Sequence, residues 1–218
     1  KALDNAGMAA SELDFIICSN VVNEYVTPQL SCIIQGGIGA SCPCIDINCA
    51  CAGFIYAVEI AESFYKAGKV RNVLVVSAEE PTRMTDWSDR RTCVLFGDGA
   101  GAAVLTPGDN IKSVKLSAAS ATDKLWQYRL LHPTPYITKE EVDMPLQMKG
   151  QDVFKFAVKA AGKDISRALK ELQVKADDVD FYLLHQANIR IIHAIRDYLE
   201  QPQETFPVNI EDHGNSSS

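Results

Sequence analysis

The stretch "DINCACAGFIYAVEIAESFYKAG", residues 46–68, joins a strand pattern to a helix pattern and decides the fold. Residues 44–50, "CIDINCA", predict a β-strand. From residue 53 onward, apolar side chains recur at helical spacing, and Gly68 is typical of a helix C-terminus. A strand that leads directly into a helix is the unit from which α/β proteins are built.

The same stretch contains two cysteines, and their positions differ in a way that matters chemically. Cys51 lies where the predicted helix begins, whereas Cys49 lies within the predicted strand. The free amides and positive dipole end of a helix stabilise a thiolate, and ligands bind at the carboxyl ends of strands in open α/β folds. Position therefore favours Cys51 as a nucleophile, with a buried structural thiol as the alternative.

Composition limits the classes of protein that fit. The chain has 218 residues with 47% hydrophobic and 22% charged residues, which suits one large or two small globular domains. A net charge of −7 argues against a nucleic-acid-binding surface. No apolar run approaches the roughly 20 residues that cross a bilayer, so we expect no membrane segment.

Seven cysteines lie in the first half of the chain. The closely spaced ones are separated by a single residue, so the sequence lacks the paired C-x-x-C spacing of a zinc site. We therefore expect small buried thiols in a reducing cytoplasm, and no metal. The chain starts at Lys1 within a helix-like segment and ends in "HGNSSS", so we expect it to be incomplete at both ends.

Along the chain, strand-like and helix-like segments alternate. The first half predicts strands at 13–21, 44–50 and 72–79, helices at 28–39 and 53–68, and two strand pieces around a glycine-rich turn at 91–107. The sequence "PGDN" at 107–110 marks a boundary, so we expect two domains, 1–107 and 108–218. The second half predicts strands at 111–120 and 179–188, helices at 150–172 and 189–201, an irregular stretch at 121–148, and a closing strand and polar loop from 205.

The two halves share a weak internal repeat. "AGMAASELDFIICSN" and "LQVKADDVDFYLLHQ" each combine a helix end, an acidic turn, an Asp-Phe pair and an apolar strand. His185 ends the apolar strand of the second half, as Cys51 follows a strand of the first, and Asn215 also follows a predicted strand end. These residues are expected to face one another across a shared crevice.

Five motifs carry a resemblance to a known family: "NCACAGF" at 48–54, "FGDGAGAAVL" at 96–105, "KGQDVFKFAV" at 149–158, "LLHQANIRII" at 183–192 and "VNIEDHGNSSS" at 208–218. Together they resemble beta-ketoacyl-acyl carrier protein synthase III of the thiolase superfamily. The resemblance implies a thiolase-like α/β fold, with two pseudo-equivalent halves in a layered αβαβα arrangement. It also implies a catalytic Cys-His-Asn triad at Cys51, His185 and Asn215.

The implied reaction belongs to bacterial type II fatty acid synthesis. Cys51 would take an acyl group, acetyl or a similar short starter, from acyl-CoA. Malonyl-acyl carrier protein would then lose CO2, and the carbanion would attack the acyl-cysteine to give a 3-ketoacyl product. The thiolate would come from the helix end, and His185 and Asn215 would stabilise the thioester oxygen as negative charge develops on it.

The resemblance also implies substrate contacts. An arginine near the adenine and phosphate end of CoA matches Arg90, although Arg91 stands where a glycine is common and leaves open which arginine contacts the nucleotide. Other positions that match the binding of CoA, pantetheine or the acyl group are Phe96, Gly150, Phe154, Ala187 and Asn188. Lys155 and Arg190 match positions near the entrance that meet an acidic carrier protein, with a solvated helix charge as the alternative.

Rival functions remain at this level. A thiolase-fold acyltransferase or a polyketide starter synthase of secondary metabolism would use the same three residue types with a CoA thioester. A non-catalytic scaffold is the alternative from a different class, and the intact Cys51, His185 and Asn215 argue against it. We further expect a cytoplasmic homodimer that needs no cofactor, with CoA thioesters as substrates.

Overall fold

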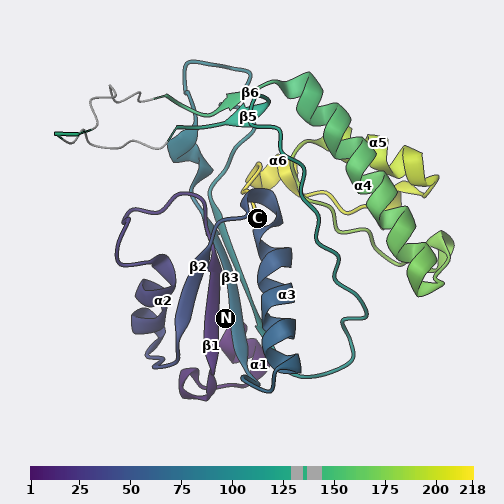
Figure 1. Cartoon of the computed structure of the whole chain (residues 1–218). Helices are drawn as coiled ribbons and strands as arrows, with labels where there is room; N and C mark the ends of the chain where they lie inside the picture. The colour runs from purple at the N-terminus through teal and green to yellow at the C-terminus, as the bar shows by residue number, and fades with distance from the viewer. Residues whose placement is uncertain (129–134, 137–143) are drawn as a thin grey trace.

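A four-stranded mixed sheet forms the centre of the first half (Figure 1), in a computed structural model that describes residues 1–128, 135–136 and 144–218. The strand order is β2-β1-β3-β4, with β1 parallel to β2 and β3, and β4 antiparallel to β3. The strands are β1 (Phe15–Ser19), β2 (Cys44–Ile47), β3 (Val73–Glu79) and β4 (Gly99–Leu105). The expectation of an α/β protein is confirmed.

Helices cover both faces of this sheet. On one face lie α1 (Ala2–Ala6) and α2 (Leu30–Ile38), and on the other lies α3 (Gly53–Lys66). Successive strand side chains point to opposite faces, so Ile16 packs toward α1 and α2 while Ile17 packs toward α3. Coverage on both faces explains why β3 reads as an unbroken apolar run.

The second half builds a separate core around two long helices. α4 (Gly150–Leu172) packs against α5 (Ile189–Leu199), beside the sheet in Figure 1. Between them and the neighbouring extended segments, the rings of Tyr182 and Phe206 stack with centroids 4.8 Å apart. The helices predicted at 150–172 and 189–201 are confirmed because each carries a continuous apolar stripe that this core buries.

The remaining elements of the described residues are a two-stranded sheet, a short helix and five 3₁₀ turns. A two-stranded sheet pairs β5 (Leu125–Trp126) with β6 (Gln147–Met148), and α6 (Ile210–His213) lies near the start of α3 in Figure 1. The 3₁₀ turns are η1 (Ala10–Glu12), η2 (Ala50–Ala52), η3 (Pro81–Met84), η4 (Ala176–Asp178) and η5 (Gln203–Thr205).

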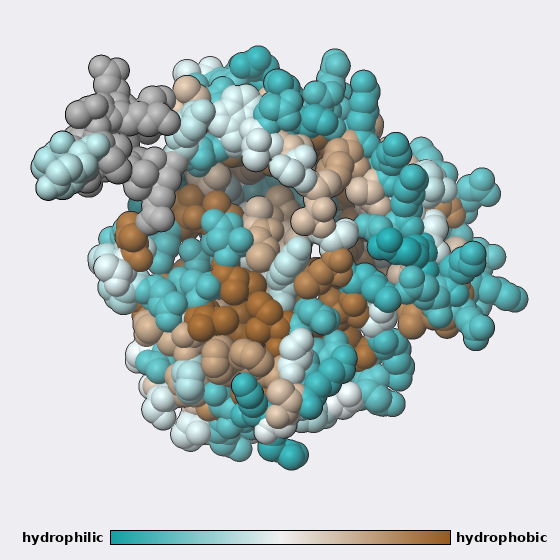
Figure 2. Space-filling view, in the orientation of Figure 1, coloured by the Kyte–Doolittle hydropathy of each residue, from teal (hydrophilic) through white to brown (hydrophobic). Residues whose placement is uncertain are grey.

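Figure 2 shows apolar residues gathered over the sheet and α3 on the viewed face, while hydrophilic residues dominate the side that carries α4 and α5. None of the helices among the described residues has the length and apolarity needed to cross a membrane.

The strand pair predicted at 91–107 is half wrong. Only β4 forms, and the glycines from 99 to 101 lie within it rather than in a turn. Upstream, Thr92 N donates to Asp89 O and Leu95 N donates to Thr92 O, each at 3.0 Å. These local bonds use the amides of Thr92 and Leu95 that a strand would offer to a neighbour, so the chain turns there, and only a single bridge forms at Phe96.

The strands predicted at 111–120, at 179–188 and after 205 are also wrong. The segment 179–188 is extended, and Tyr182 N donates to Thr205 O at 2.8 Å, but no ladder follows along the described residues. Extended backbone becomes a strand only where a neighbour pairs with it repeatedly. The second sheet expected of residues 108–218 is therefore limited, in the described part of the chain, to β5 and β6.

The division into two domains between residues 107 and 108 stays a prediction. Of the irregular stretch predicted at 121–148, residues 129–134 and 137–143 lie outside the described residues.

Candidate active site

Cys51 occupies the turn predicted for it. It lies in η2, between the end of β2 and the first residue of α3, and its side chain is exposed. The residue before it, Ala50, has a φ of 46°, a left-handed conformation that residues other than glycine seldom adopt. Such local strain is often found at functional sites, because the surrounding structure must hold it in place.

The pKa of the Cys51 thiol differs from the expectation. Burial raises the pKa most, the residue's own backbone amide lowers it, and the charge of Glu79 raises it further. The thiol is open to solvent but surrounded by protein, so its anion is less well hydrated than in free water. The helix end alone therefore does not supply a thiolate, and a proton acceptor is needed.

Glu79 is a buried carboxyl group at the carboxyl end of β3, beside this turn. Its Oε2 accepts a hydrogen bond from Val21 N at 2.8 Å, and its Oε1 accepts one from Ser218 Oγ at 3.0 Å. Burial raises the pKa of Glu79, while these hydrogen bonds lower it. Glu79 thus links two distant segments of the chain next to Cys51.

Ser218 lies in this polar cluster. Ser77 Oγ donates to Ser218 O at 2.6 Å, and the Ser218 hydroxyl lies 2.7 Å from Ser77 Oγ and 3.1 Å from Ser19 Oγ. A Cβ on Gly53 would overlap Ser19 Oγ and lie 3.4 Å from Ser218 Cβ. The start of α3 therefore fits closely against the segment that contains Asn215.

Asn215 is buried and held by the backbone. Asn215 N donates to Leu95 O at 2.7 Å, and Gly97 N donates to Asn215 O at 3.1 Å, so Phe96 and Asn215 form a parallel bridge. The side-chain Oδ1 accepts from Ser217 N at 3.0 Å. This bond fixes the amide with its oxygen turned to Ser217, and leaves Nδ2 as the group that can donate to a substrate.

His185 lies just before α5, in a loop that is tied to the segment leading to Asn215. Asn209 N donates to Gln186 Oε1 at 3.1 Å, and Gln186 Nε2 donates to Pro207 O at 3.4 Å. The His185 side chain is accessible, but the protein around it lowers its pKa through loss of hydration. Its imidazole is therefore neutral at pH 7 and able to accept a proton.

The structure brings two of the three predicted residues to one region through shared partners. Glu79 and Ser218 connect the Cys51 turn to the segment 215–218, and Gln186 connects the His185 loop to 207–209. Among the hydrogen bonds of the described residues, none joins the side chains of Cys51, His185 and Asn215 directly. Their roles as a triad stay a prediction.

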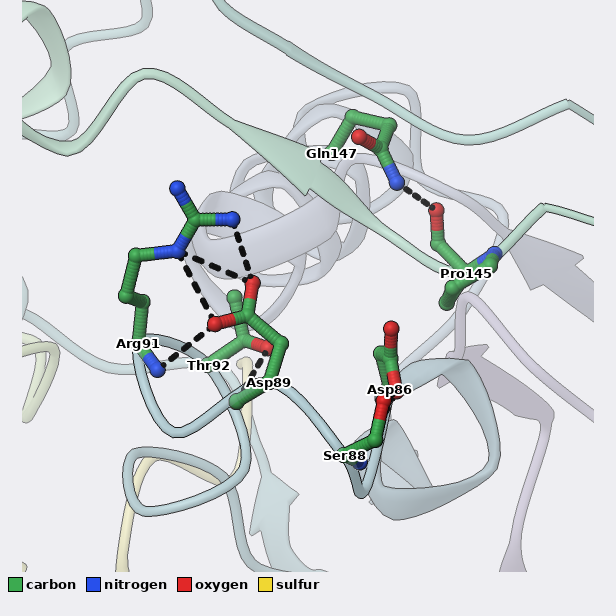
Figure 3. A network of polar contacts seen from close by, with 7 residues as sticks. All are labelled: Asp86, Ser88, Asp89, Arg91, Thr92, Pro145 and Gln147. Atoms are coloured by element: carbon green, nitrogen blue, oxygen red, sulfur yellow. Dashed lines mark hydrogen bonds and ion pairs between the residues drawn. The ribbon is translucent and has the colours of Figure 1, made fainter.

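A groove of about 670 Å³ lies beside the start of α4. Arg91 and Gly150 both line it, together with Asp89, whose carboxylate binds Arg91 Nε at 2.9 Å (Figure 3). This ion pair raises the pKa of Arg91 and lowers that of Asp89. Arg90, the residue matched by the resemblance, does not line this groove, so Arg91 is the arginine that the groove places beside Gly150.

The other predicted contact residues are spread over α4 and the start of α5. Phe154 lies one turn after Gly150 and is 37% exposed, and Lys155 and Arg190 are exposed on the same two helices. Asn188 has a structural task, because its Oδ1 caps α5 by accepting from Arg190 N at 2.9 Å. Ala187 is partly buried against the core of α4 and α5.

Sequence reasoning missed Glu79 and Ser218 as parts of the site. The sequence did contain a sign that Glu79 belongs to the site, because it is a charged residue at the carboxyl end of the otherwise apolar strand β3. Ser218 offered none, because its partners Ser19 and Ser77 are far away in sequence.

Comparison with known proteins places this geometry in context. The family model for 3-oxoacyl-[acyl-carrier-protein] synthase III matches residues 45–123, and the model for its C-terminal part matches residues 169–218. The beta-ketoacyl-[acyl-carrier-protein] synthase III of Xanthomonas oryzae pv. oryzae is 39% identical over all of this chain, which covers 68% of that protein. The protein of the same name from Geobacillus kaustophilus is also 39% identical over the whole chain, covering 67% of its length.

Solved structures agree. The 3-oxoacyl-[acyl-carrier-protein] synthase III of Aquifex aeolicus superimposes with a TM-score of 0.87 at 38% identity, over 99% of this chain and 68% of that one. A priming beta-ketosynthase of the R1128 polyketide pathway superimposes with a TM-score of 0.82 at 33% identity, over 100% of this chain and 66% of that one.

The fold therefore defines a thiolase-fold condensing enzyme, an acyltransferase by class. Within this class the assignment is specific, because the family models and the curated relatives agree. The chain belongs to the beta-ketoacyl-[acyl-carrier-protein] synthase III family.

Proposed function

We propose that this chain carries out the starter condensation of bacterial type II fatty acid synthesis with Cys51 as the nucleophile. The observation that carries the proposal is the exposed Cys51 in η2, at the carboxyl end of the sheet, beside the anchored segment 215–218. The thiol attacks the thioester carbon of an acyl-CoA. The bond from that carbon to the sulfur of CoA breaks, and CoA leaves as its thiol.

The attack on acyl-CoA first requires that the Cys51 thiol lose its proton. Because the pKa of the Cys51 thiol is raised, the thiol is protonated at neutral pH. His185 has a lowered pKa and a neutral ring, so it is the group that we assign to accept this proton and to return it to the departing CoA sulfur.

The second demand is stabilisation of negative charge. Malonyl-acyl carrier protein loses CO2, and electron density moves onto its thioester oxygen before the new carbon–carbon bond forms at the acyl-cysteine. Asn215 Nδ2 and an N–H of His185 are assigned as donors to this oxygen. The bond from Ser217 N to Asn215 Oδ1 favours this role, since it orients the amide before substrate arrives.

Substrate binding is assigned to the groove beside α4. Arg91 and Lys149 supply positive charge there for the phosphates of CoA, and Gly150 allows close approach because nothing lies within 4 Å of where its Cβ would be. Asp86, Asp89 and Asp152 line the same groove, so Arg91 must exchange its ion pair with Asp89 for a phosphate when CoA binds.

The partner surface is assigned to the exposed cations at the starts of α4 and α5. Lys155 and Arg190 would attract an acidic acyl carrier protein, with an effect mainly on the rate of encounter. A homodimer in the cytoplasm stays our expectation for the whole enzyme.

Intact-protein mass spectrometry tests the proposal directly. The protein is incubated with a panel of acyl-CoAs, mapped by peptide, and then given malonyl-acyl carrier protein. We expect an acyl adduct on Cys51 that is discharged to a 3-ketoacyl product, and none in Cys51→Ala, while Cys93→Ala serves as the matched control and keeps the adduct.

Other outcomes are equally informative. An adduct that malonyl-acyl carrier protein cannot discharge would identify an acyltransferase with another acceptor, as in secondary metabolism. Absence of an adduct on Cys51 with every acyl-CoA would contradict the mechanism and leave the family assignment standing.

A further inference from the structure

Two cysteines outside the candidate active site lie in sulfur–sulfur contact. Cys32 belongs to α2 and Cys44 is the first residue of β2, and their Sγ atoms are 3.2 Å apart. Both are free thiols and both are partly exposed. A disulfide has an S–S length of about 2.05 Å, so the two atoms need to approach by only roughly 1.2 Å.

The backbone around this pair is held on both sides. The carboxylate of Asp46, on β2, accepts from Leu30 N at 2.7 Å and from Ser31 N at 2.8 Å, which ties the start of α2 to the strand. Gln29 reinforces the junction, because its Nε2 donates to Cys44 O at 2.9 Å. The two cysteines are therefore kept at bonding range by contacts that do not involve their own sulfur atoms.

The side-chain amide of Gln29 also contacts both sulfur atoms. Its Nε2 lies 3.5 Å from Cys32 Sγ and 3.9 Å from Cys44 Sγ, so one amide group is close to both thiols. Cys42 is near as well but is buried, and its carbonyl oxygen accepts from Gln35 Nε2 at 2.7 Å. The partly exposed members of this cysteine cluster are thus Cys32 and Cys44.

We propose that Cys32 and Cys44 form a redox-active dithiol that a hydroperoxide converts reversibly into a disulfide joining α2 to β2. One thiol loses its proton and the thiolate attacks an oxygen of hydrogen peroxide; the O–O bond breaks, and hydroxide leaves and takes up that proton as water, which gives a sulfenic acid. The second thiol attacks that sulfur, the S–S bond forms, and the S–O bond breaks with loss of a second water. Two thiols lose two electrons and two protons, and with hydrogen peroxide the products are the disulfide and two waters.

This site is independent of the proposed function, because none of its residues belongs to the acyl-transfer machinery. The bridge closes a loop between positions 32 and 44 across a junction that is already hydrogen-bonded. It should therefore raise the melting temperature without loss of helix signal, since a cross-link mainly restricts the unfolded chain.

Peptide mapping of the oxidised protein tests the proposal. The reduced protein is titrated with hydrogen peroxide, blocked with N-ethylmaleimide, digested without reductant and analysed by mass spectrometry. We expect a linked peptide pair joining Cys32 to Cys44, lighter by two hydrogen atoms, which dithiothreitol separates. Cys32→Ala and Cys44→Ala should abolish it, and Cys93→Ala should not.

Three results would overturn the proposal. One is that Cys32 and Cys44 both remain alkylatable after peroxide has oxidised Cys51. Another is that Cys42 replaces either member in the linked peptides. The third is a lower melting temperature of the oxidised protein. Mapping of the unmodified sequence gives the first two answers even where a cysteine variant fails to fold.

Discussion

At the scale of single residues, the chemistry of this site depends on how protein surroundings shift proton affinities. The Cys51 thiol and the His185 imidazole are both shifted toward their neutral forms, the first upward and the second downward in pKa. Burial is the leading cause in each case, because it disfavours charge of either sign. The sequence located both residues, but a helix end at Cys51 suggested the opposite direction for the thiol.

Replacement of Glu79 by glutamine should make Cys51 more reactive. The carboxylate charge raises the pKa of the thiol, so its removal should lower that pKa and increase the thiolate fraction at neutral pH. The measurement is the rate of iodoacetamide alkylation at Cys51 against pH, with Glu59→Gln on α3 as the matched control. A profile displaced to higher pH, or one that Glu59→Gln reproduces, would contradict this reading of Glu79.

His185 should make stability depend on mildly acidic pH. Its pKa is lower in the folded protein than the ordinary value of 6.5, so the unfolded state binds a proton first as pH falls. His185 therefore leaves the free energy of unfolding unchanged above about pH 6.5 and lowers it as pH falls from there through the folded-state pKa. Urea midpoints at pH 7.5 and 5.5 should differ less in His185→Gln than in the unsubstituted protein or in His193→Gln. Equal acid sensitivity of the urea midpoint in all three proteins would count against a lowered pKa of His185.

At the scale of elements, the sequence predicted the bounds of helices and strands correctly where the element itself has a clear apolar pattern. The helix predicted at 53–68 became α3 and the strand predicted at 72–79 became β3, each within two residues. The strand predicted at 179–188 did not form because its apolar run is extended but has, among the described residues, no neighbouring strand to pair with. Tyr182 packs into the core around Phe206, while Leu183 is 80% exposed. Apolar side chains on an extended segment do not make a strand, because a strand needs a neighbouring backbone that pairs with it repeatedly.

Gly162 lies against the ring of Tyr198 where α4 contacts α5. A Cβ at this position would lie 2.5 Å from a ring carbon of Tyr198, so Gly162→Ala should force the helices apart and cost about 1–3 kcal/mol. Gly36→Ala in α2 is the matched control, because nothing lies within 4 Å of its Cβ. It should stabilise the protein by about 0.5–1 kcal/mol. Urea unfolding of both variants measures the difference, and a neutral or stabilising Gly162→Ala would show that the helices are not closely packed there.

At the scale of the whole molecule, residues 214–218 contribute to a site built mainly by β1, β3 and the start of α3. Segment 214–218 returns from α6 to the carboxyl ends of β1 and β3, where Ser19, Ser77 and Glu79 bind Ser218. Asn215 bridges to Phe96 just before β4. Residues on β1 and β3 and residues of segment 214–218 therefore meet at the candidate active site, through serines and Glu79 that the sequence did not identify.

Loss of this anchor should impair acyl transfer without unfolding the protein. Ser77→Ala removes the hydroxyl that bonds Ser218 at 2.6 Å, so segment 214–218 should open more often. We expect faster hydrogen exchange at the amides of Gly97 and Asn215 and slower acylation of Cys51. The control is Ser63→Ala on the exposed side of α3. Unchanged exchange at both amides would argue that the anchor does not hold Asn215.

The sequence by itself determined what short-range patterns encode: the α/β class, the amphipathic helices α3 and α4, the buried strand β3, and Cys51, His185 and Asn215 as residues of interest. Tertiary structure alone decided which polar groups meet. The hydrogen bond between Ser77 and Ser218 spans 141 positions, and the contact between Cys32 and Cys44 crosses from a helix to a strand. Tertiary structure also set the direction of the Cys51 pKa. The physical reason is that periodicity is a property of neighbouring residues, whereas desolvation and long-range hydrogen bonds exist only once distant segments have packed together.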